Sequence, residues 1–275
     1  MGDNGMKTRK HTLLSYLRLY GKFLKMTIAA RLQYKVDTLL LSLAVFVRES
    51  VTVVTLWFML NKVSTINGWD MGQLLFMYSF VFLTYSLCIL IFTGVRDFES
   101  IANQGEFDTY LTKPLRPLFQ VIARRSDVMA TIGHGGLGVV LIVYAASRSG
   151  ITFDWAHIGI LITMIVGGVL IQGGILLFVA SLTFWTTKSS EIQNLLFYQM
   201  RGFIAYPISI YPTLIRYLLT YILPFAFVSF YPAQYFYSVQ MSAVGLLTPL
   251  VGILVFGFAL AIWKIGIRRY ASTGH

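Results

Sequence analysis

Charged side chains that could engage a partner gather in residues 94–127, between two strongly apolar segments. The acidic residues of this stretch, Asp97, Glu99, Glu106 and Asp108, fill its first half. The basic residues, Lys113, Arg116, Arg124 and Arg125, fill its second half. A structured, charged loop in an otherwise apolar chain predicts a docking surface for a cytosolic partner. The alternative is a solvated connector.

Helical spacing within this loop predicts two short helices that carry its charged residues. Phe98, Ile101 and Ala102 recur at helical intervals, and Gly105 is placed to end that short helix. A second short helix is expected over residues 106–111, where the prolines that follow would stop it.

A second charged group, Arg48 and Glu49, interrupts an apolar run at residues 38–60. Ionised groups at mid-membrane cost about 2.5–3.5 kcal/mol each on insertion scales, so both must face protein or water. Adjacent residues point in different directions on a helix, so we expect that these two do not simply neutralise each other. At least one should reach another helix, another subunit or an aqueous cavity. A pathway or gating role and a satisfied pair at a subunit interface are equal alternatives.

His134 lies in a later apolar run, where it could carry a proton, although a hydrogen bond to a neighbour is the more usual role. The chain contains no motif for other common catalytic or cofactor-binding chemistry. It contains no GxxxxGK[ST] phosphate loop, no HExxH zinc motif and no GxSxG elbow. We therefore expect no ATPase activity, no catalytic residues, no metal site and no cofactor in this chain. Its single cysteine, Cys88, is expected to pack in an apolar run.

Composition identifies the class of protein that carries these residues. Of 275 residues, 56% are hydrophobic and 12% charged, and the mean hydropathy is +0.70. Soluble domains carry about 25% charged residues, so this is an integral membrane protein. The net charge of +11 does not indicate nucleic-acid binding, because the positive residues lie at the ends of apolar segments.

The apolar segments predict an all-α membrane protein with six transmembrane helices. Residues 1–10 are expected to be disordered, 11–35 to form a basic amphipathic helix in the lipid headgroup region, and 36–275 to form the membrane domain. The spans are expected at about 38–60, 71–95, 128–147, 158–185, 194–210 and 241–263. Residues 211–238 are interrupted by Pro212, Pro224 and Pro232, and we expect a re-entrant hairpin of short helices there.

Positive charge predicts the orientation of these spans. With both termini in the cytoplasm, most of the 22 Lys and Arg residues fall on the inner side, and only Lys62, Arg148 and Arg216 fall on the outer side. Treating the proline-rich region as a full span would place the basic carboxy-terminal segment outside. Six spans with a hairpin are therefore favoured over seven.

This layout resembles the permease subunits of bacterial type-2 ABC exporters, the ABC-2 family. The segments GEFDTYLTKPLRPLF (105–119) and ILPFAFVSFYPAQYF (222–236) are similar to one bacterial branch of it. The resemblance implies a multi-pass protein of the bacterial cytoplasmic membrane that exports a drug, peptide, lipid or glycan. It also implies contact with membrane lipids and no nucleic-acid partner.

The resemblance further implies a partner and a site for it. A coupling helix over 96–104 would sit in a cleft of a separate ABC ATPase subunit, present in two copies that bind ATP and Mg²⁺. Gly105, Phe107, Asp108 and Pro114 would shape the returning chain, and the amphipathic helix would contact the same ATPase. The docking residues implied are Arg96, Asp97, Phe98, Glu99, Ile101, Gln104, Gly105, Phe107 and Asp108.

A second permease subunit, identical or different, would complete the translocation path. Arg48, Glu49 and Arg201 on the first and fifth spans are candidates for the pathway or the subunit interface. Two other classes compete with this interpretation. One is a self-contained secondary transporter or channel using His134, Glu49 or Arg48 for ions, although the chain has no convincing internal repeat. The other is a membrane scaffold or enzyme.

Overall fold

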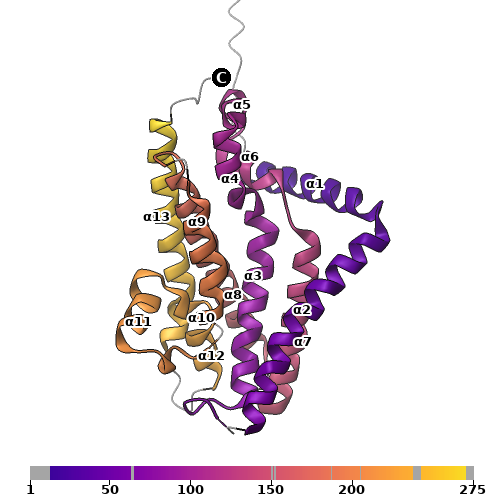
Figure 1. The fold of residues 1–275 in the computed structure, drawn as a ribbon, viewed down its shortest axis with the longest axis vertical. Coiled ribbons are helices and arrows are strands. Elements are labelled where there is room, and N and C mark those ends of the chain that lie inside the picture. Colours follow the sequence, from indigo (N-terminus) through magenta and orange to yellow (C-terminus); the bar gives the residue numbers. More distant parts are fainter. Residues whose placement is uncertain are drawn as a thin grey trace, which may run out of the picture.

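The computed structural model describes residues 13–62, 65–149, 151, 153–186, 188–204, 206–237 and 243–270. This part of the chain is built from helices joined by short turns, with one isolated antiparallel bridge between Ile66 and Trp69 (Figure 1). The predicted all-helical class is confirmed. The amino-terminal segment predicted to be disordered, residues 1–10, lies outside the described residues.

Within the described residues, five helices are long and apolar enough to cross a membrane. They are α2 (Lys35–Lys62), α3 (Met71–Arg96), α7 (Val128–Ser149), α8 (Trp155–Leu182) and α13 (Thr248–Arg269). Each corresponds to a predicted span, within a few residues at most ends. The last one starts later than the predicted residue 241, because a 3-10 turn, η5 (Ala243–Leu247), precedes it.

Side-chain caps explain where two of these helices begin. Asp70 accepts from the backbone N–H of Gln73, whose side chain bonds the Asp70 N–H in return, and this capping box starts α3. Asp154 likewise accepts from the backbone N–H of His157 at the start of α8. Hydrogen bonds from His157 lower the pKa of the Asp154 carboxyl. Hydrogen bonds at the N-cap residues therefore fix where α3 and α8 begin.

The predicted fifth span, residues 194–210, is wrong as an uninterrupted helix. The chain forms α9 (Ser190–Gln193), a π-helical segment η1 (Asn194–Gln199) and α10 (Met200–Ile204). Proline at position 207 disfavours helical backbone in the residue before it. Residues 190–204 would extend about 22 Å at 1.5 Å per residue, short of a ~30 Å hydrocarbon core. No described helix in this region is long enough to cross alone.

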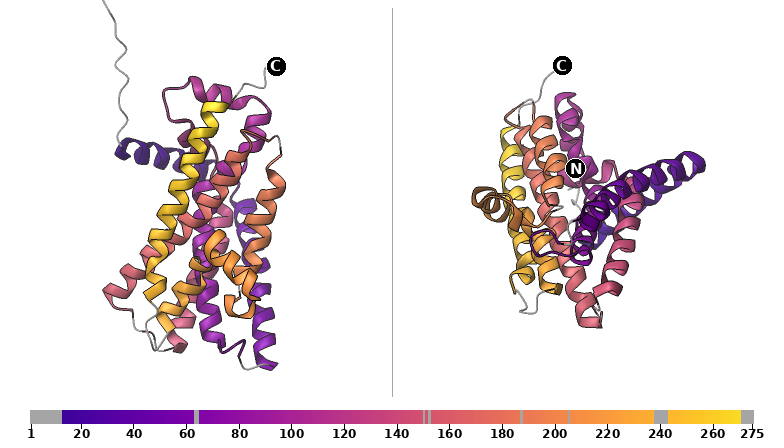
Figure 2. Two further views of the ribbon diagram at one scale, coloured as in Figure 1. Left: turned by 90° about the vertical axis from the view of Figure 1, so that its left-hand side faces the viewer. Right: turned by 60° about the horizontal axis from the view of Figure 1, so that its bottom comes forward.

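Residues 206–237 form a run of short helices. They are η2 (Ile208–Ile210), α11 (Thr213–Tyr217), η3 (Leu218–Ile222), η4 (Phe225–Phe227) and α12 (Phe230–Tyr237). Pro212 and Pro224 precede α11 and η4, and Pro232 lies in the first turn of α12. Both views place α11 and α12 in the half of the bundle away from α4 and α5 (Figure 2). The prediction that this segment enters and leaves the membrane on one side stays a prediction.

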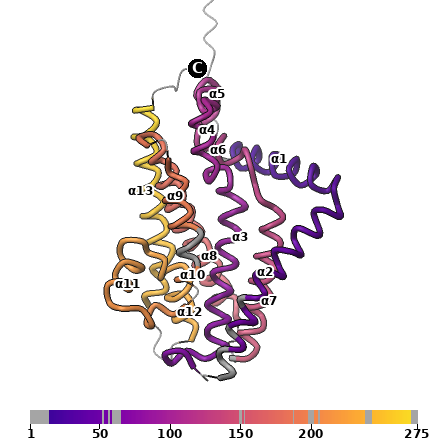
Figure 3. The backbone as a smooth tube through the Cα atoms, viewed as in Figure 1, coloured from indigo at the N-terminus to yellow at the C-terminus, as the bar shows by residue number. Residues whose placement is uncertain are grey.

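The long helices pack in the order α13, α8, α3, α7 and α2. The α8–α13 contact depends on small residues, because a Cβ on Gly252 would lie 2.6 Å from the carbonyl oxygen of Gly167. At the other edge, α2 is mostly exposed. The tube drawing shows α1 (Leu13–Leu32) crossing the same end of the bundle as α4, α5 and the last turn of α13 (Figure 3). The described ends of the chain therefore lie on one side.

Candidate functional site

Three short helices between α3 and α7 cover this end of the bundle. They are α4 (Phe98–Asn103), α5 (Glu106–Thr112) and α6 (Pro117–Arg124), and we call them the α4–α6 cap. The first two match the predicted pair. Gly105 joins them with φ +72°, a left-handed conformation that favours glycine. The sequence analysis missed α6, which has a proline in its first turn, a position where proline is favoured.

The inner face of the cap is an aromatic cluster. Phe98, Ile101 and Phe107 are at most 1% exposed. The Phe98 ring centroid lies 4.7 Å from that of Trp263 on α13 and 5.1 Å from that of Phe184, just after α8. These three residues, which the resemblance implied for docking, therefore face inward within this chain and fasten the cap to α8 and α13.

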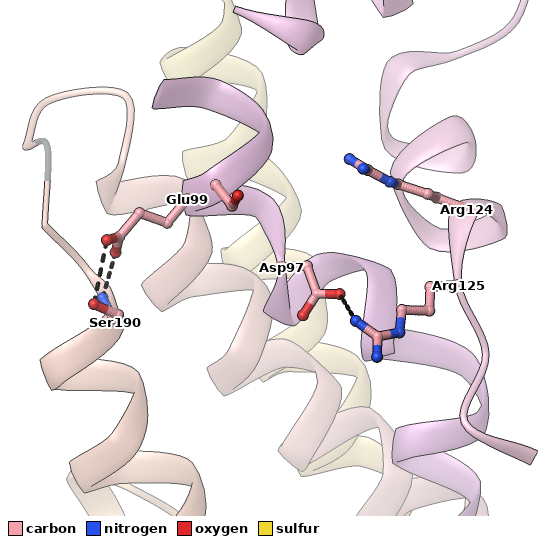
Figure 4. Close-up of a pocket in the computed structure, with 6 residues that line it drawn as sticks. Asp97, Glu99, Arg124, Arg125 and Ser190 are labelled. Atoms are coloured by element: carbon pink, nitrogen blue, oxygen red, sulfur yellow. Dashed lines mark hydrogen bonds and ion pairs between the residues drawn. The ribbon is translucent and has the colours of Figure 1, made fainter. Parts of the chain in front are cut away.

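Glu99 links the cap to the helical segment of residues 190–204, which starts with α9. Its Oε2 accepts from the backbone N–H groups of Ser189 and Ser190, both at 2.5 Å, and from the Ser189 hydroxyl at 3.0 Å. The Ser190 hydroxyl donates to Oε1 at 3.2 Å. A carboxylate is favourable at this position, because the first N–H groups of a helix lack partners within it. Figure 4 shows Glu99 reaching Ser190 from the neighbouring helix.

Ion pairs hold the other side of the cap. Asp97 contacts Arg96 at 3.2 Å and Arg125 at 2.8 Å. Asp97, Glu99, Ser100, Arg124, Arg125 and Ser190 line an open cavity of about 520 Å³ (Figure 4). Arg124 also pairs with Glu106 at 2.7 Å. The cavity is thus lined by both acidic and basic side chains. The fold brings together the acidic first half and the basic second half of the loop, which are separate in the sequence.

The outer face of the cap is polar. Ser100, Asn103 and Gln104 are exposed, and the Gln104 amide donates to the Ser100 hydroxyl at 3.0 Å. Asp108 is half-buried beside Tyr270, and burial together with this carboxylate raises the pKa of Tyr270. Among the predicted docking residues, Gln104 is therefore the one fully presented to a partner.

Helix α1 contacts the same cap. The Tyr16 ring packs edge-on against Phe119 at 4.7 Å, and its hydroxyl accepts from the Arg116 N–H at 3.4 Å. One turn later, the Tyr20 hydroxyl donates to the Leu90 carbonyl at 3.0 Å. Contacts from α1 therefore reach both α6 and α3.

A second cluster lies within the membrane-spanning part. Arg48 donates to Glu49 at 2.8 Å, so the expectation that these neighbours would not neutralise each other is wrong. The long Arg48 side chain folds back along α2 far enough to meet the carboxylate. The expectation that one of them reaches another helix is confirmed, because Glu49 Oε1 lies 3.3 Å from His134 Nε2 on α7.

The His134 ring is fixed from its other nitrogen. Nδ1 lies 2.7 Å from the Ala130 carbonyl oxygen, which can only accept, so Nδ1 carries a proton. This hydrogen bond is the ordinary role expected for a membrane histidine. Glu49 is 5% exposed while the Arg48 side chain is 67% exposed. Arg201 lies on α10, but its side chain falls outside the described atoms, so the predicted grouping of all three residues is not tested.

Comparison with known families decides which class of membrane protein this is. A family model described as ABC-2 family transporter protein matches residues 46–274. The chain belongs to this family. The match covers most of α2 and everything from α3 to α13, so this ABC-2 permease carries both the α4–α6 cap and the Glu49 cluster inside the family region. No curated protein and no solved structure matches the chain.

Membership in the ABC-2 family fixes the coarse function. The chain is a multi-pass membrane permease and not itself the ATPase. The family implies association with an ABC ATPase and usually with another permease.

Proposed function

We propose that this chain is the permease subunit of an ATP-driven exporter and that its α4–α6 cap docks a separate ATPase subunit. The main support for this proposal is the Glu99 carboxylate, which joins α4 to the start of α9 through four hydrogen bonds. A partner seated on the exposed face of α4 would push a helix that is bonded to a membrane segment. The aromatic cluster under Phe98 supports the same conclusion, because it limits how far α4 can move alone.

The complete transporter that we propose has two permease subunits and two ATPase subunits, which bind ATP and Mg²⁺. The second permease, identical or different, covers the exposed face of α2, where Leu39, Val47 and Val51 are more than half exposed. Arg48 would then lie at the interface or the path between the permeases, with Glu49 and Arg201. We place the assembly in the bacterial cytoplasmic membrane, with both termini in the cytoplasm and lipid around the remaining faces.

The Glu49–His134 contact is the one observation that favours a self-contained secondary transporter. A proton shared between these groups could couple flux to an ion gradient. The cap argues against this alternative, because a transporter that works alone has no use for a rigid, polar surface tied to its membrane helices.

Co-purification and ATP turnover test the proposal. The full chain is isolated from its host membranes, together with the variants Gln104→Trp and Trp155→Gln. Trp155 is 89% exposed at the opposite end of the bundle, so Trp155→Gln controls for the effect of changing an exposed residue away from the cap. We expect Gln104→Trp to lower the recovered ATPase at least ten-fold and Trp155→Gln to leave it unchanged. If the chain were purified without any ATPase and its transport were driven by a proton gradient, it would be a self-contained secondary transporter.

A further inference from the structure

An apolar cavity of about 420 Å³ lies where the short helices meet α8 and α13. Its walls come from Ile175 and Phe178 on α8, from Leu254 and Phe258 on α13, and from the segment 222–224. The volume falls within the usual range of small-molecule sites. The cavity is therefore large enough for part of an amphiphile.

This cavity opens toward the side of the bundle that meets lipid. Ile222, Leu254 and Phe258 line it and are 72%, 64% and 59% exposed. Leu254 and Phe258 belong to a membrane-spanning helix, so the material in front of them is hydrocarbon. An acyl chain can enter from the bilayer without crossing water.

A second cavity of about 220 Å³, with a mixed polar and apolar lining, adjoins the same short helices. It is lined by Thr213, Arg216, Tyr217, Thr220 and Tyr221 of one helical face, together with Tyr231. One chain segment contributes to both cavities, because Tyr221 lines this one and Ile222, the next residue, lines the apolar one. Figure 2 shows this segment, including α11, on the outside of the bundle.

Arg216 is the only charged residue in the sequence from 206 to 237. Its guanidinium donates to the carbonyls of Ser209 and Tyr211 at 3.3 and 3.4 Å, and no ion pair with a carboxylate is found for it in the described part of the chain. Arg216 is exposed on the side predicted to be the outer one, and a guanidinium matches the phosphate of a lipid headgroup. Arg216 therefore lines the cavity with N–H donors other than those of Nη2.

We propose that the two cavities together bind one anionic phospholipid, with its phosphate at Arg216 and an acyl chain in the apolar cavity. The tyrosine rings around Arg216 suit the boundary between headgroup and hydrocarbon, where aromatic side chains with a polar tip are enriched. Selectivity among phospholipids comes from the headgroup, because lipids with the same acyl chains fill the apolar cavity equally. The site does not depend on the proposed ATPase, and either proposal can fail alone.

Native mass spectrometry of the full chain in detergent tests the headgroup. Phosphatidylglycerol and phosphatidylcholine with the same acyl chains are added at equal concentration. We expect phosphatidylglycerol to bind about ten-fold more tightly, and Arg216→Gln to abolish this preference while Arg216→Lys keeps part of it. Arg148→Gln is the matched control, because Arg148 is also an exposed cation at a helix end away from the cap. An equal loss in both Gln variants would mean general charge attraction and overturn the site.

A second pair of variants tests the acyl chain. Leu254→Trp fills the apolar cavity, while Leu250→Trp changes an exposed residue one turn earlier on α13 that does not line it. We expect Leu254→Trp alone to weaken phosphatidylglycerol binding by at least ten-fold. Inorganic phosphate is expected not to compete, since it lacks the chain. Competition by phosphate, or equal binding by the two Trp variants, would show that no lipid site of this kind exists.

Discussion

Single residues decide how firmly the α4–α6 cap is joined to the membrane helices. Glu99 accepts the N–H groups of Ser189 and Ser190, whereas Glu106 in the same cap makes an exposed pair with Arg124. The two carboxylates have the same chemistry but different partners. Backbone N–H groups at a helix start have few alternatives, while an exposed ion pair competes with water. Glu99 is therefore the carboxylate whose loss should matter.

Replacing Glu99 by Gln should destabilise the junction by about 1 kcal/mol, the usual effect of losing a good helix cap. We expect the loss to appear as a lower thermal unfolding midpoint and, in the assembled transporter, as ATP turnover no longer tied to export. Glu106→Gln is the control and should change either quantity little, because exposed pairs contribute about 0–1 kcal/mol. Equal effects of the two substitutions would contradict the role given to Glu99.

The Arg48–Glu49 pair makes a second prediction at this scale. Arg48→Met leaves the Glu49 carboxylate buried without its cation, which should cost about 1–2 kcal/mol of unfolding free energy, less than for a fully buried pair because the Arg48 side chain is 67% exposed. Replacing both residues, Arg48→Met with Glu49→Leu, removes the charge altogether and should restore most of that stability. Thermal unfolding of the wild-type protein, of each single variant and of the double variant gives the coupling energy. Additive effects would show that the 2.8 Å contact does not stabilise the chain.

Sequence reasoning found the charged residues but not their partners. Glu99 was placed correctly on a short helix, yet Ser189 lies 90 positions away in a loop that carries no pattern. A satisfied pair was left open as an alternative for Arg48 and Glu49, but the expectation that the two would not simply neutralise each other ignored the length of the arginine side chain. Charge type is readable from sequence, whereas a side-chain contact depends on packing that no local pattern records.

At the scale of elements, the cap is held against α3 by close backbone packing. Gly94, near the end of α3, faces α6 so closely that a Cβ there would lie 1.9 Å from the carbonyl oxygen of Val121. A backbone oxygen cannot turn away as a flexible side chain can. The position of α6, and of the arginines at its end, therefore depends on this glycine.

Gly94→Ala should displace α6 and destabilise the chain by about 1–3 kcal/mol, as overpacking does. Gly257→Ala on α13 is the matched control, because a Cβ there meets no atom within 4 Å. The control should be neutral or slightly stabilising, since alanine restricts the unfolded chain. Thermal unfolding compares them, and a Gly94 variant as stable as the control would rule out the close approach.

The long helices were predictable because about 20 apolar residues are needed to cross the hydrocarbon core, and hydropathy records that length. The fifth span was not. Residues 194–210 are mostly apolar, with Arg201 as their one charged residue, so composition does not reveal the π-helical segment or the end of the helix at Ile204. Prolines correctly marked the short helices that follow. Apolar character predicts burial in the membrane, but continuity of a helix depends on tertiary packing.

At the scale of the whole molecule, the described ends of the chain and the α4–α6 cap lie at one end of the bundle. Cys88 is the only cysteine and is fully buried, so introduced cysteines can be labelled with little background. We expect Thr112→Cys to react with a membrane-impermeant reagent only in inside-out vesicles. Trp155→Cys should react only in right-side-out vesicles. Reaction of both from the same side would contradict the proposed orientation.

The central claim is that the exposed face of α4 meets an ATPase. The most direct measurement places a photo-activated crosslinking amino acid at position 104 or 155 of the full chain in its own cells. Mass spectrometry then identifies the adducts. The account predicts an adduct with an ATP-hydrolysing subunit from position 104 and none from position 155. Efficient crosslinking at position 104 to lipid or water alone, with no such subunit, would contradict it.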